Sequence, residues 1–133
     1  MICLTLSENT IEKNLRLVQD NRAYIDICEL RIDFLTEEEL PKAKEFPHLV
    51  DIPVILTYRR VQDGGQCTLP EKTRRNTLIH TLDGGFAYVD IEDDVKKNDV
   101  EEKAKAMGTK VIRSLHDFEG VPEDIFSKIH SMA

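Results

Sequence analysis

The sequence predicts an α/β protein built from five strand–helix units around a parallel sheet. Three observations support this: strand-like and helix-like segments alternate along the chain, the connections between them are short, and no linker, repeat or low-complexity tract divides the sequence. Alternation of this kind is typical of parallel sheets covered by helices. We therefore expect a single domain over residues 1–133, a length that can bury a hydrophobic core.

Five short apolar runs are expected to be strands, and the segments between them are expected to be helices. The expected strands are residues 2–6, 24–33, 52–59, 86–92 and 110–116, and the expected helices are about 8–20, 36–46, 70–82, 98–107 and 122–132. In the first helix, Ile11, Leu15 and Val18 recur at the spacing of one helix face. The fourth helix begins with a capping box at Asn98 and ends at Gly108.

Polar side chains follow the apolar part of four expected strands, always on one face. Successive strand residues alternate between faces, so residues two apart lie on the same side of a sheet. The polar positions are Glu29 and Arg31, Arg59, Asp90 and Glu92, and His116. A barrel interior with its active site at the C-terminal mouth has this pattern, whereas an open doubly wound sheet is apolar on both faces for most of its length. The pattern therefore favours part of a β/α-barrel with a catalytic face.

The longest irregular stretch, residues 60–69, follows the third expected strand and contains Gly64 and Gly65. A mobile loop at this position would lie on the same side as the polar strand ends and could cover a substrate. The glycine pair lacks the spacing of a phosphate-binding loop, and it could instead form a simple turn.

Composition excludes several classes of function. The net charge of −7 argues against nucleic acid or an anionic membrane as the main partner. Cys3, Cys28 and Cys67 lack framework spacing, which favours reduced thiols and a cytoplasmic protein; we expect Cys3 and Cys28 to be core residues. No apolar run is long enough to span a bilayer, and the N-terminus lacks a signal-peptide pattern.

Several polar residues have simpler explanations. His48, His80 and His130 are expected at the surface or in packing, and no histidine pair has ligand spacing with a third donor, so we expect no metal or other cofactor. His116 could be a buried structural imidazole, and the acids and arginines at the strand ends could be ion pairs that close the barrel mouth. Arg113 falls on the helix-facing side and must reach an acidic partner or the surface.

Four motifs occur in order at the ends of the second to fifth strands. They are ELRID at 29–33, TYR at 57–59 with DGG at 63–65, VDIE at 89–92, and SLHDF at 114–118. In this order and spacing the chain resembles type I 3-dehydroquinate dehydratase over essentially its whole length. The resemblance implies a (β/α)8 TIM barrel and a lyase of the shikimate pathway, which leads to aromatic amino acids. The expected reaction dehydrates 3-dehydroquinate, a small-molecule substrate, to 3-dehydroshikimate.

The resemblance also implies a mechanism. A lysine condenses with the substrate ketone to form an iminium, which makes the neighbouring C–H acidic enough for a histidine to remove the proton. His116 matches this catalytic histidine, which is also a plausible proton donor to the leaving hydroxyl. Asp63 matches the position of an acid that orients the histidine, where the family usually has Glu. The shorter Asp63 would have to act through water or loop movement.

Five further residues match positions of the family's substrate pocket. Glu29, Arg31 and Arg59 match residues that hold the polyhydroxy ring. Asp90 and Glu92 match an acidic pair that supports the arginines and the surroundings of the lysine.

The family's Schiff-base lysine lies on the sixth strand, and a barrel allows about 31 residues per unit, so this lysine is expected past residue 133. We therefore expect about five of eight units, a truncated form or partial gene product without activity of its own. The unpaired edges of the first and fifth strands favour a homo-oligomer or a partner fragment. A non-catalytic half-barrel that binds or assembles, and the first part of a bifunctional dehydratase–shikimate dehydrogenase, remain alternatives. The ELRID and LHDF motifs argue against another lysine-dependent, aldolase-type barrel.

Overall fold

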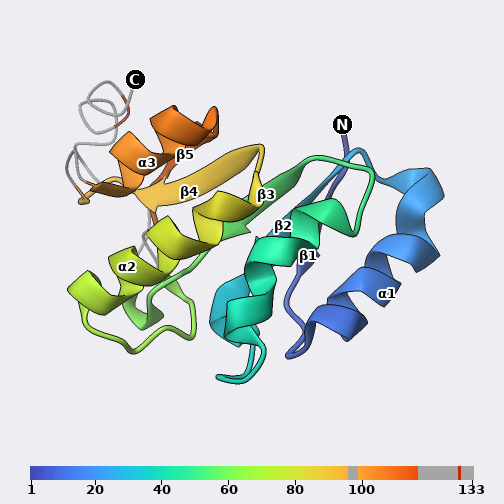
Figure 1. Cartoon of the computed structure of the whole chain (residues 1–133), viewed down its shortest axis with the longest axis horizontal. Coiled ribbons are helices and arrows are strands. Elements are labelled where there is room, and N and C mark those ends of the chain that lie inside the picture. The colour runs from blue at the N-terminus through green and yellow to red at the C-terminus, as the bar shows by residue number, and fades with distance from the viewer. Residues whose placement is uncertain (96–98, 117–128, 130–133) are drawn as a thin grey trace.

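The computed structural model describes residues 1–95, 99–116 and 129, which form one parallel five-stranded sheet with helices on one side (Figure 1). The strands are β1 (Cys3–Leu6), β2 (Ile27–Arg31), β3 (Val54–Thr57), β4 (Tyr88–Glu92) and β5 (Lys110–Ser114). They lie side by side in the order in which they occur in the sequence. A doubly wound sheet reverses this order and carries helices on both faces, so the winding is that of a barrel. The predicted fold class is confirmed.

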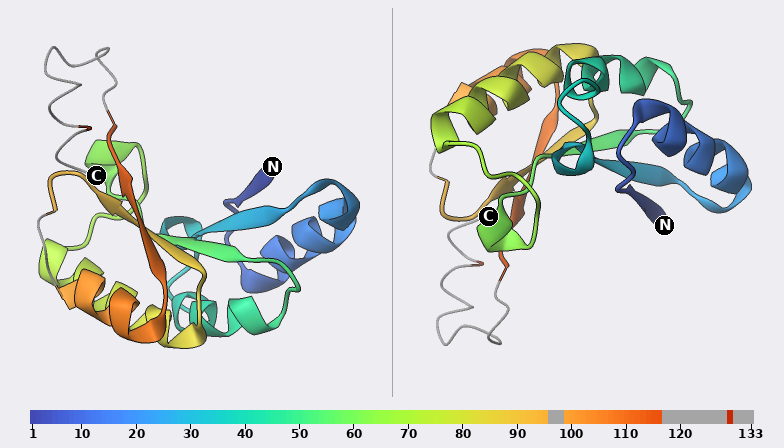
Figure 2. Two further views of the ribbon diagram at one scale, coloured as in Figure 1. Left: turned by 90° about the horizontal axis from the view of Figure 1, so that it is seen from above. Right: turned by 90° about the horizontal axis from the view of Figure 1, so that it is seen from below.

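Four longer helices cover one face of the sheet (Figure 2). They are α1 (Ile11–Asn21), η3 (Leu40–His48), α2 (Glu71–Thr81) and α3 (Asp99–Met107). Short 3₁₀ turns adjoin them or the strands: η1 (Arg22–Tyr24), η2 (Ile32–Phe34), η4 (Val61–Asp63) and η5 (Leu82–Gly84). The helix expected at 122–132 and the capping residue Asn98 lie outside the described residues.

Several expected elements differ from the structure. The strands expected at 52–59 and 110–116 are too long, because β3 ends at Thr57 and β5 ends at Ser114, so Arg59 and His116 lie beyond them. The helix expected at 36–46 is wrong in type and range, because residues 40–48 form the 3₁₀-helix η3. Pro47 lies inside η3, and proline has no N–H for an α-helical hydrogen bond and crowds the carbonyl four residues earlier. The strand expected at 24–33 is too long, because η1 and η2 take up its two ends.

The packing of α1 and the C-terminal end of α3 agree with the sequence-based expectations. The hydroxyl of Thr10 caps α1 by accepting a hydrogen bond from the Lys13 amide at 3.1 Å. Ile11 and Val18 of α1 are buried against the sheet, as their spacing predicted. Gly108 follows α3 with φ +74°, a conformation that costs glycine little and that ends the helix.

The hydrophobic core lies between the sheet and the helix layer. Leu30, Leu56 and Val89 are partners in neighbouring strands, and all three are fully buried against the helices. Glu29 and Tyr88, which point to the other face, are only partly buried. We call that other face, which carries no described helix, the inner face. At these positions the two faces of the sheet alternate as predicted.

The three cysteines form no disulfide bond. Cys3, Cys28 and Cys67 are all free thiols. Burial raises the pKa of Cys28 to about 12, which keeps its thiol protonated. The expectation that Cys3 is a core residue is wrong, because it lies exposed on the inner face of the edge strand β1.

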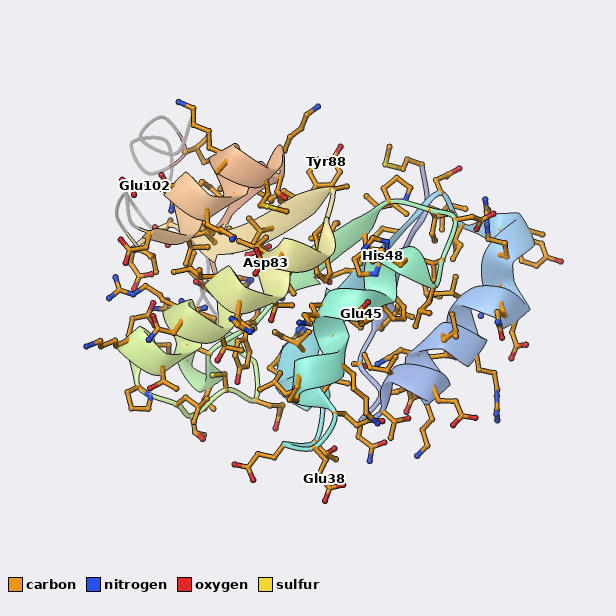
Figure 3. The ribbon with its side chains drawn as sticks, in the orientation of Figure 1. Glu38, Glu45, His48, Asp83, Tyr88 and Glu102 are labelled. Carbon is orange, nitrogen blue, oxygen red and sulfur yellow. The ribbon has the colours of Figure 1, made fainter. Side chains whose placement is uncertain are left out.

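His48 lies exposed on η3 in the helix layer, as expected (Figure 3). None of the described helices is long and apolar enough to cross a membrane.

Candidate active site

A continuous row of polar side chains crosses the inner face from β2 to β5. The Thr57 hydroxyl donates to Glu29 Oε2 at 2.7 Å, and the Ser114 hydroxyl donates to Asp90 Oδ1 at 2.6 Å. Arg59, just after β3, joins the two halves, because its Nη2 lies 3.4 Å from Asp90 Oδ2 and 3.9 Å from Glu29 Oε2. Parallel strands end at the same edge of a sheet, so polar residues near their C-terminal ends meet here. We call these five residues the polar row.

The centre of the polar row is a guanidinium between two carboxylates. Arg59 Nε is buried and has no hydrogen-bond partner among the described residues. Burial raises the pKa of Asp90, although the Ser114 hydroxyl, Arg59 and His116 oppose this by favouring the carboxylate. The row can therefore both donate to and accept hydrogen bonds from a polyhydroxy ligand.

Asp90 and Glu92 make the stability of the chain depend on pH. Burial raises the pKa of both carboxyls, so the folded chain binds their protons more readily than the unfolded chain does. The stability that the two protonated carboxyls contribute is fully present below the ordinary carboxyl pKa, and it is lost as pH rises through the raised pKa. In Asp90→Asn we expect the free energy of unfolding to fall less steeply than in the wild type between about pH 4 and 6.

Urea denaturation across that pH range checks this prediction. Asp51→Asn serves as the control, because the Arg22 hydrogen bond lowers the pKa of Asp51 and moves its titration below this range, so the slope between about pH 4 and 6 should equal that of the wild type. An equal slope in Asp90→Asn and wild type would contradict the prediction.

His116 and Asp63 lie close together without a hydrogen bond. His116 Nδ1 lies 4.0 Å from Asp63 Oδ1, beyond hydrogen-bonding distance, and it has no other hydrogen-bond partner in the described part of the chain. The other carboxylate oxygen of Asp63 accepts from Arg60 Nε at 2.6 Å. The sequence-based expectation that the short Asp63 does not reach the histidine directly agrees with this geometry.

Arg31 lies apart from the polar row, although it shares the parity of Glu29. Its guanidinium donates to both oxygens of Asp33 at 3.0 and 2.8 Å and lies over the ring of Phe34. The same Asp33 carboxylate accepts from the Gln66 amide at 3.0 Å. Arg31 therefore holds the loop after β3 in place through Asp33.

Glu92 also lies apart from Asp90, and the two acids contact different arginines. Arg74, in the first turns of α2, donates to Glu92 Oε1 at 3.2 Å and to Glu92 Oε2 at 3.1 Å. It also donates to the Tyr58 carbonyl at 2.7 Å. Arg74 and Glu92 are each only 2% exposed, so this ion pair fastens α2 to the ends of β3 and β4.

Arg113 reaches an acidic partner, as predicted. Its guanidinium pairs with Glu101 of α3 and donates to the carbonyls of Glu92 and Val95. These contacts tie β5 to the loop after β4 and to α3.

The loop after β3 is a hydrogen-bonded turn. The Gly65 amide donates to the Arg60 carbonyl at 2.8 Å, and the Cys67 amide donates to the Arg59 carbonyl at 3.0 Å. A methyl group on Gly65 would lie 2.2 Å from the Arg59 oxygen, so only glycine fits this approach. The turn thereby sets where Arg59, Arg60 and Asp63 enter the site.

The sequence-based analysis missed several residues of the site. Thr57 and Ser114 share the parity of their neighbours Arg59 and His116, and this signal could have identified them. Arg74 lies on a helix, where strand parity gives no signal. In the part of the chain that the structure describes, no group of three His, Cys, Asp or Glu side chains could hold a metal ion.

Comparisons with known proteins give a consistent result. A family model described as type I 3-dehydroquinase matches residues 2–133. A 3-dehydroquinate dehydratase of Methanococcus vannielii is 34% identical over 126 residues, which are 92% of this chain and 56% of that protein. The bifunctional 3-dehydroquinate dehydratase/shikimate dehydrogenase of Arabidopsis thaliana is 27% identical over 128 residues, 92% of this chain and 21% of that protein.

A solved structure agrees with the sequence matches. The type I 3-dehydroquinate dehydratase from Clostridium difficile, solved with covalently modified comenic acid, superposes with a TM-score of 0.78 at 25% identity. The match covers 92% of this chain and 53% of that one. The chain thus spans about half the length of the single-function relatives it matches.

Proposed function

This chain belongs to the type I 3-dehydroquinase family, and on that premise we propose that it supplies the first five βα units of a 3-dehydroquinate dehydratase. Such a lyase of the shikimate pathway removes water from 3-dehydroquinate to give 3-dehydroshikimate. The observation that supports the proposal best is the polar row, which lies on one face at the C-terminal ends of the strands with His116 beside it. In barrel enzymes, this end of the strands carries the catalytic groups.

In the proposed mechanism His116 moves the protons. An iminium between a lysine and the substrate ketone withdraws electrons, so the imidazole can take a proton from the neighbouring carbon. The electron pair left on that carbon expels the β-hydroxyl group, which leaves as water after receiving a proton from the same imidazole. Asp63 faces Nδ1, which leaves Nε2 as the nitrogen for this exchange.

The polar row is the proposed binding surface for the ring hydroxyls of the substrate. The guanidinium of Arg59 supplies donors, and Glu29 and Asp90 supply acceptors. Arg31 and Glu92 act indirectly in this proposal. The side chain of Arg31 is paired with Asp33, and that of Glu92 is paired with Arg74.

The proposed iminium lysine is not among the described residues. Lys110 is the described lysine that lies on a strand, and it shares the face of His116. It begins β5, however, roughly 20 Å from His116 at 3.3 Å per residue. The other described lysines lie on helices: Lys13, Lys42, Lys44, Lys72, Lys103 and Lys105. We propose that the 133-residue chain has no dehydratase activity alone.

A chimera tests the proposed function. Joining this chain to the part of the M. vannielii enzyme beyond the matched region is expected to restore turnover, followed by the ultraviolet absorbance of the conjugated product. Borohydride with 3-dehydroquinate is expected to trap a covalent adduct on the chimera and none on the 133-residue chain, as read by mass spectrometry. An adduct on the isolated chain would contradict the proposal.

One observation favours a second candidate, a half-barrel that binds without chemistry. Arg59 Nε is buried and without a hydrogen-bond partner within the described ranges, in a row that needs no lysine to bind hydroxyls. Calorimetry that shows 3-dehydroquinate binding to the isolated chain, together with a folded chimera that lacks turnover, would support this candidate.

We also propose that the chain associates through its sheet edges and works in the cytoplasm. Among the described residues β1 pairs only with β2, and β5 pairs only with β4, so both outer strands expose backbone groups that can pair with another chain. Light scattering that shows a monomer at high concentration would contradict the association.

A further inference from the structure

Arg60 joins two loops that lie beyond the C-terminal ends of the strands. Its Nε donates to Asp63 Oδ2 at 2.6 Å within the loop after β3. Its Nη2 donates to Asp94 Oδ1 at 2.8 Å in the loop after β4. The planar guanidinium can hold two carboxylates at once, so a single side chain fixes the position of one loop relative to the other.

The contact between Arg60 and Asp63 is shielded from water. The two side chains are 14% and 12% exposed, respectively, whereas Asp94 is 57% exposed. Burial alone would lower the pKa of Arg60, but the hydrogen bonds that Arg60 donates to Asp63 and Asp94 outweigh this and raise it, so the guanidinium stays charged. The backbone of Arg60 is fixed as well, because its carbonyl accepts from the amides of Asp63 and Gly65.

This arrangement determines where the Asp63 carboxylate points. Arg60 takes one oxygen, and the other oxygen faces His116 Nδ1 across 4.0 Å. A carboxylate beside one imidazole nitrogen favours the tautomer that carries its proton there, and it leaves the lone pair on the other nitrogen. Asp63 is too far for a hydrogen bond, so its influence on His116 depends on being held in place.

We propose that Arg60 is a positioning residue. By bridging Asp63 and Asp94 it fixes the Asp63 carboxylate beside His116 and thereby selects the Nδ1–H tautomer of His116. In this tautomer Nε2 is the proton acceptor. The catalytic meaning of the tautomer rests on the proposed function, but the tautomer itself is a property of the chain without substrate.

Nitrogen-15 NMR of the imidazole rings measures the tautomer directly. The spectra are recorded on the 133-residue chain at alkaline pH, where imidazoles are neutral, and His116→Gln identifies the His116 signals. We expect Arg60→Met to lower the ratio of Nδ1–H to Nε2–H by about threefold or more, the size of one weak polar contact. Asp63→Asn is expected to do the same, and Arg60→Met should add nothing in that background.

Two matched variants control for loss of charge and loss of folding. Arg22→Met removes an arginine that also pairs with an aspartate at 2.6 Å, but at exposed positions remote from the row, and it should leave the ratio unchanged. If circular dichroism shows that Arg60→Met does not fold, Arg60→Lys and Asp94→Asn carry the test. Lysine keeps the charge but cannot hold both carboxylates in the same geometry, so the ratio should still fall.

The outcomes separate this inference from the proposed function. An unchanged ratio in folded Arg60→Met or Arg60→Lys, or a further fall in the Asp63→Asn background, would overturn the positioning role. Turnover by the chimera would then still support the proposed function. A ratio that falls as expected, beside a folded chimera that never turns over, would keep the positioning role and reject the dehydratase assignment.

Discussion

Replacing Arg74 with methionine is expected to lower the free energy of unfolding by about 3–5 kcal/mol, the largest stability effect that we predict for a single substitution. Arg74 and Glu92 are both almost fully buried, and two hydrogen bonds of 3.1 and 3.2 Å join them. Methionine leaves the Glu92 carboxylate buried without its counter-charge. It also leaves the Tyr58 carbonyl without the donor that lies 2.7 Å away.

The double variant Arg74→Met/Glu92→Gln separates the ion pair from packing. Neutralising Glu92 removes the uncompensated charge, so the double variant should recover a large part of the stability that Arg74→Met loses. Urea denaturation followed by circular dichroism measures all three proteins. Arg16→Met is the control, since its pair with Glu12 is exposed and its loss should cost no more than about 0.5 kcal/mol. A loss in Arg74→Met as small as in Arg16→Met would show that the buried pair adds no net stability.

The contact between Arg74 and Glu92 could not be predicted from strand alternation. Strand alternation predicted the inner-face positions of Glu29, Arg59 and Asp90, because parallel strands bring their ends to one edge. Glu92 has the same parity as Asp90, yet it pairs with a side chain from the helix layer. A long arginine in the first turns of α2 can reach over the end of the sheet, and periodicity contains no information about that reach.

The loops show a second limit of sequence reasoning. The motifs predicted that Asp63 and His116 belong to one site, and the structure places them 4.0 Å apart. The role of Arg60 could not be predicted, because its partner Asp94 lies in a different loop and the contact depends on the packing of both loops. In the same way, Pro47 could be read as a helix breaker, but the place of η3 beside α1 and α2 depends on contacts between segments far apart in the sequence.

The largest effect on activity is expected from His116→Gln in the active chimera, with turnover falling about 10²–10⁴-fold. Glutamine is polar and of comparable size, but it cannot take up and release a proton near neutral pH. In the proposed mechanism the iminium forms before His116 acts. Borohydride should therefore still trap the adduct on His116→Gln, whereas product formation should almost stop.

This pairing of two measurements distinguishes a proton-transfer role from a structural one. His48→Gln is the matched control, because His48 is exposed on η3 in the helix layer, and both its trapping and its turnover should equal those of the parent chimera (Figure 3). If His116→Gln stays folded but loses the adduct together with turnover, His116 is needed for iminium formation or for the shape of the site. If turnover persists, the imidazole beside Asp63 is not the catalytic base, and another group must remove the proton.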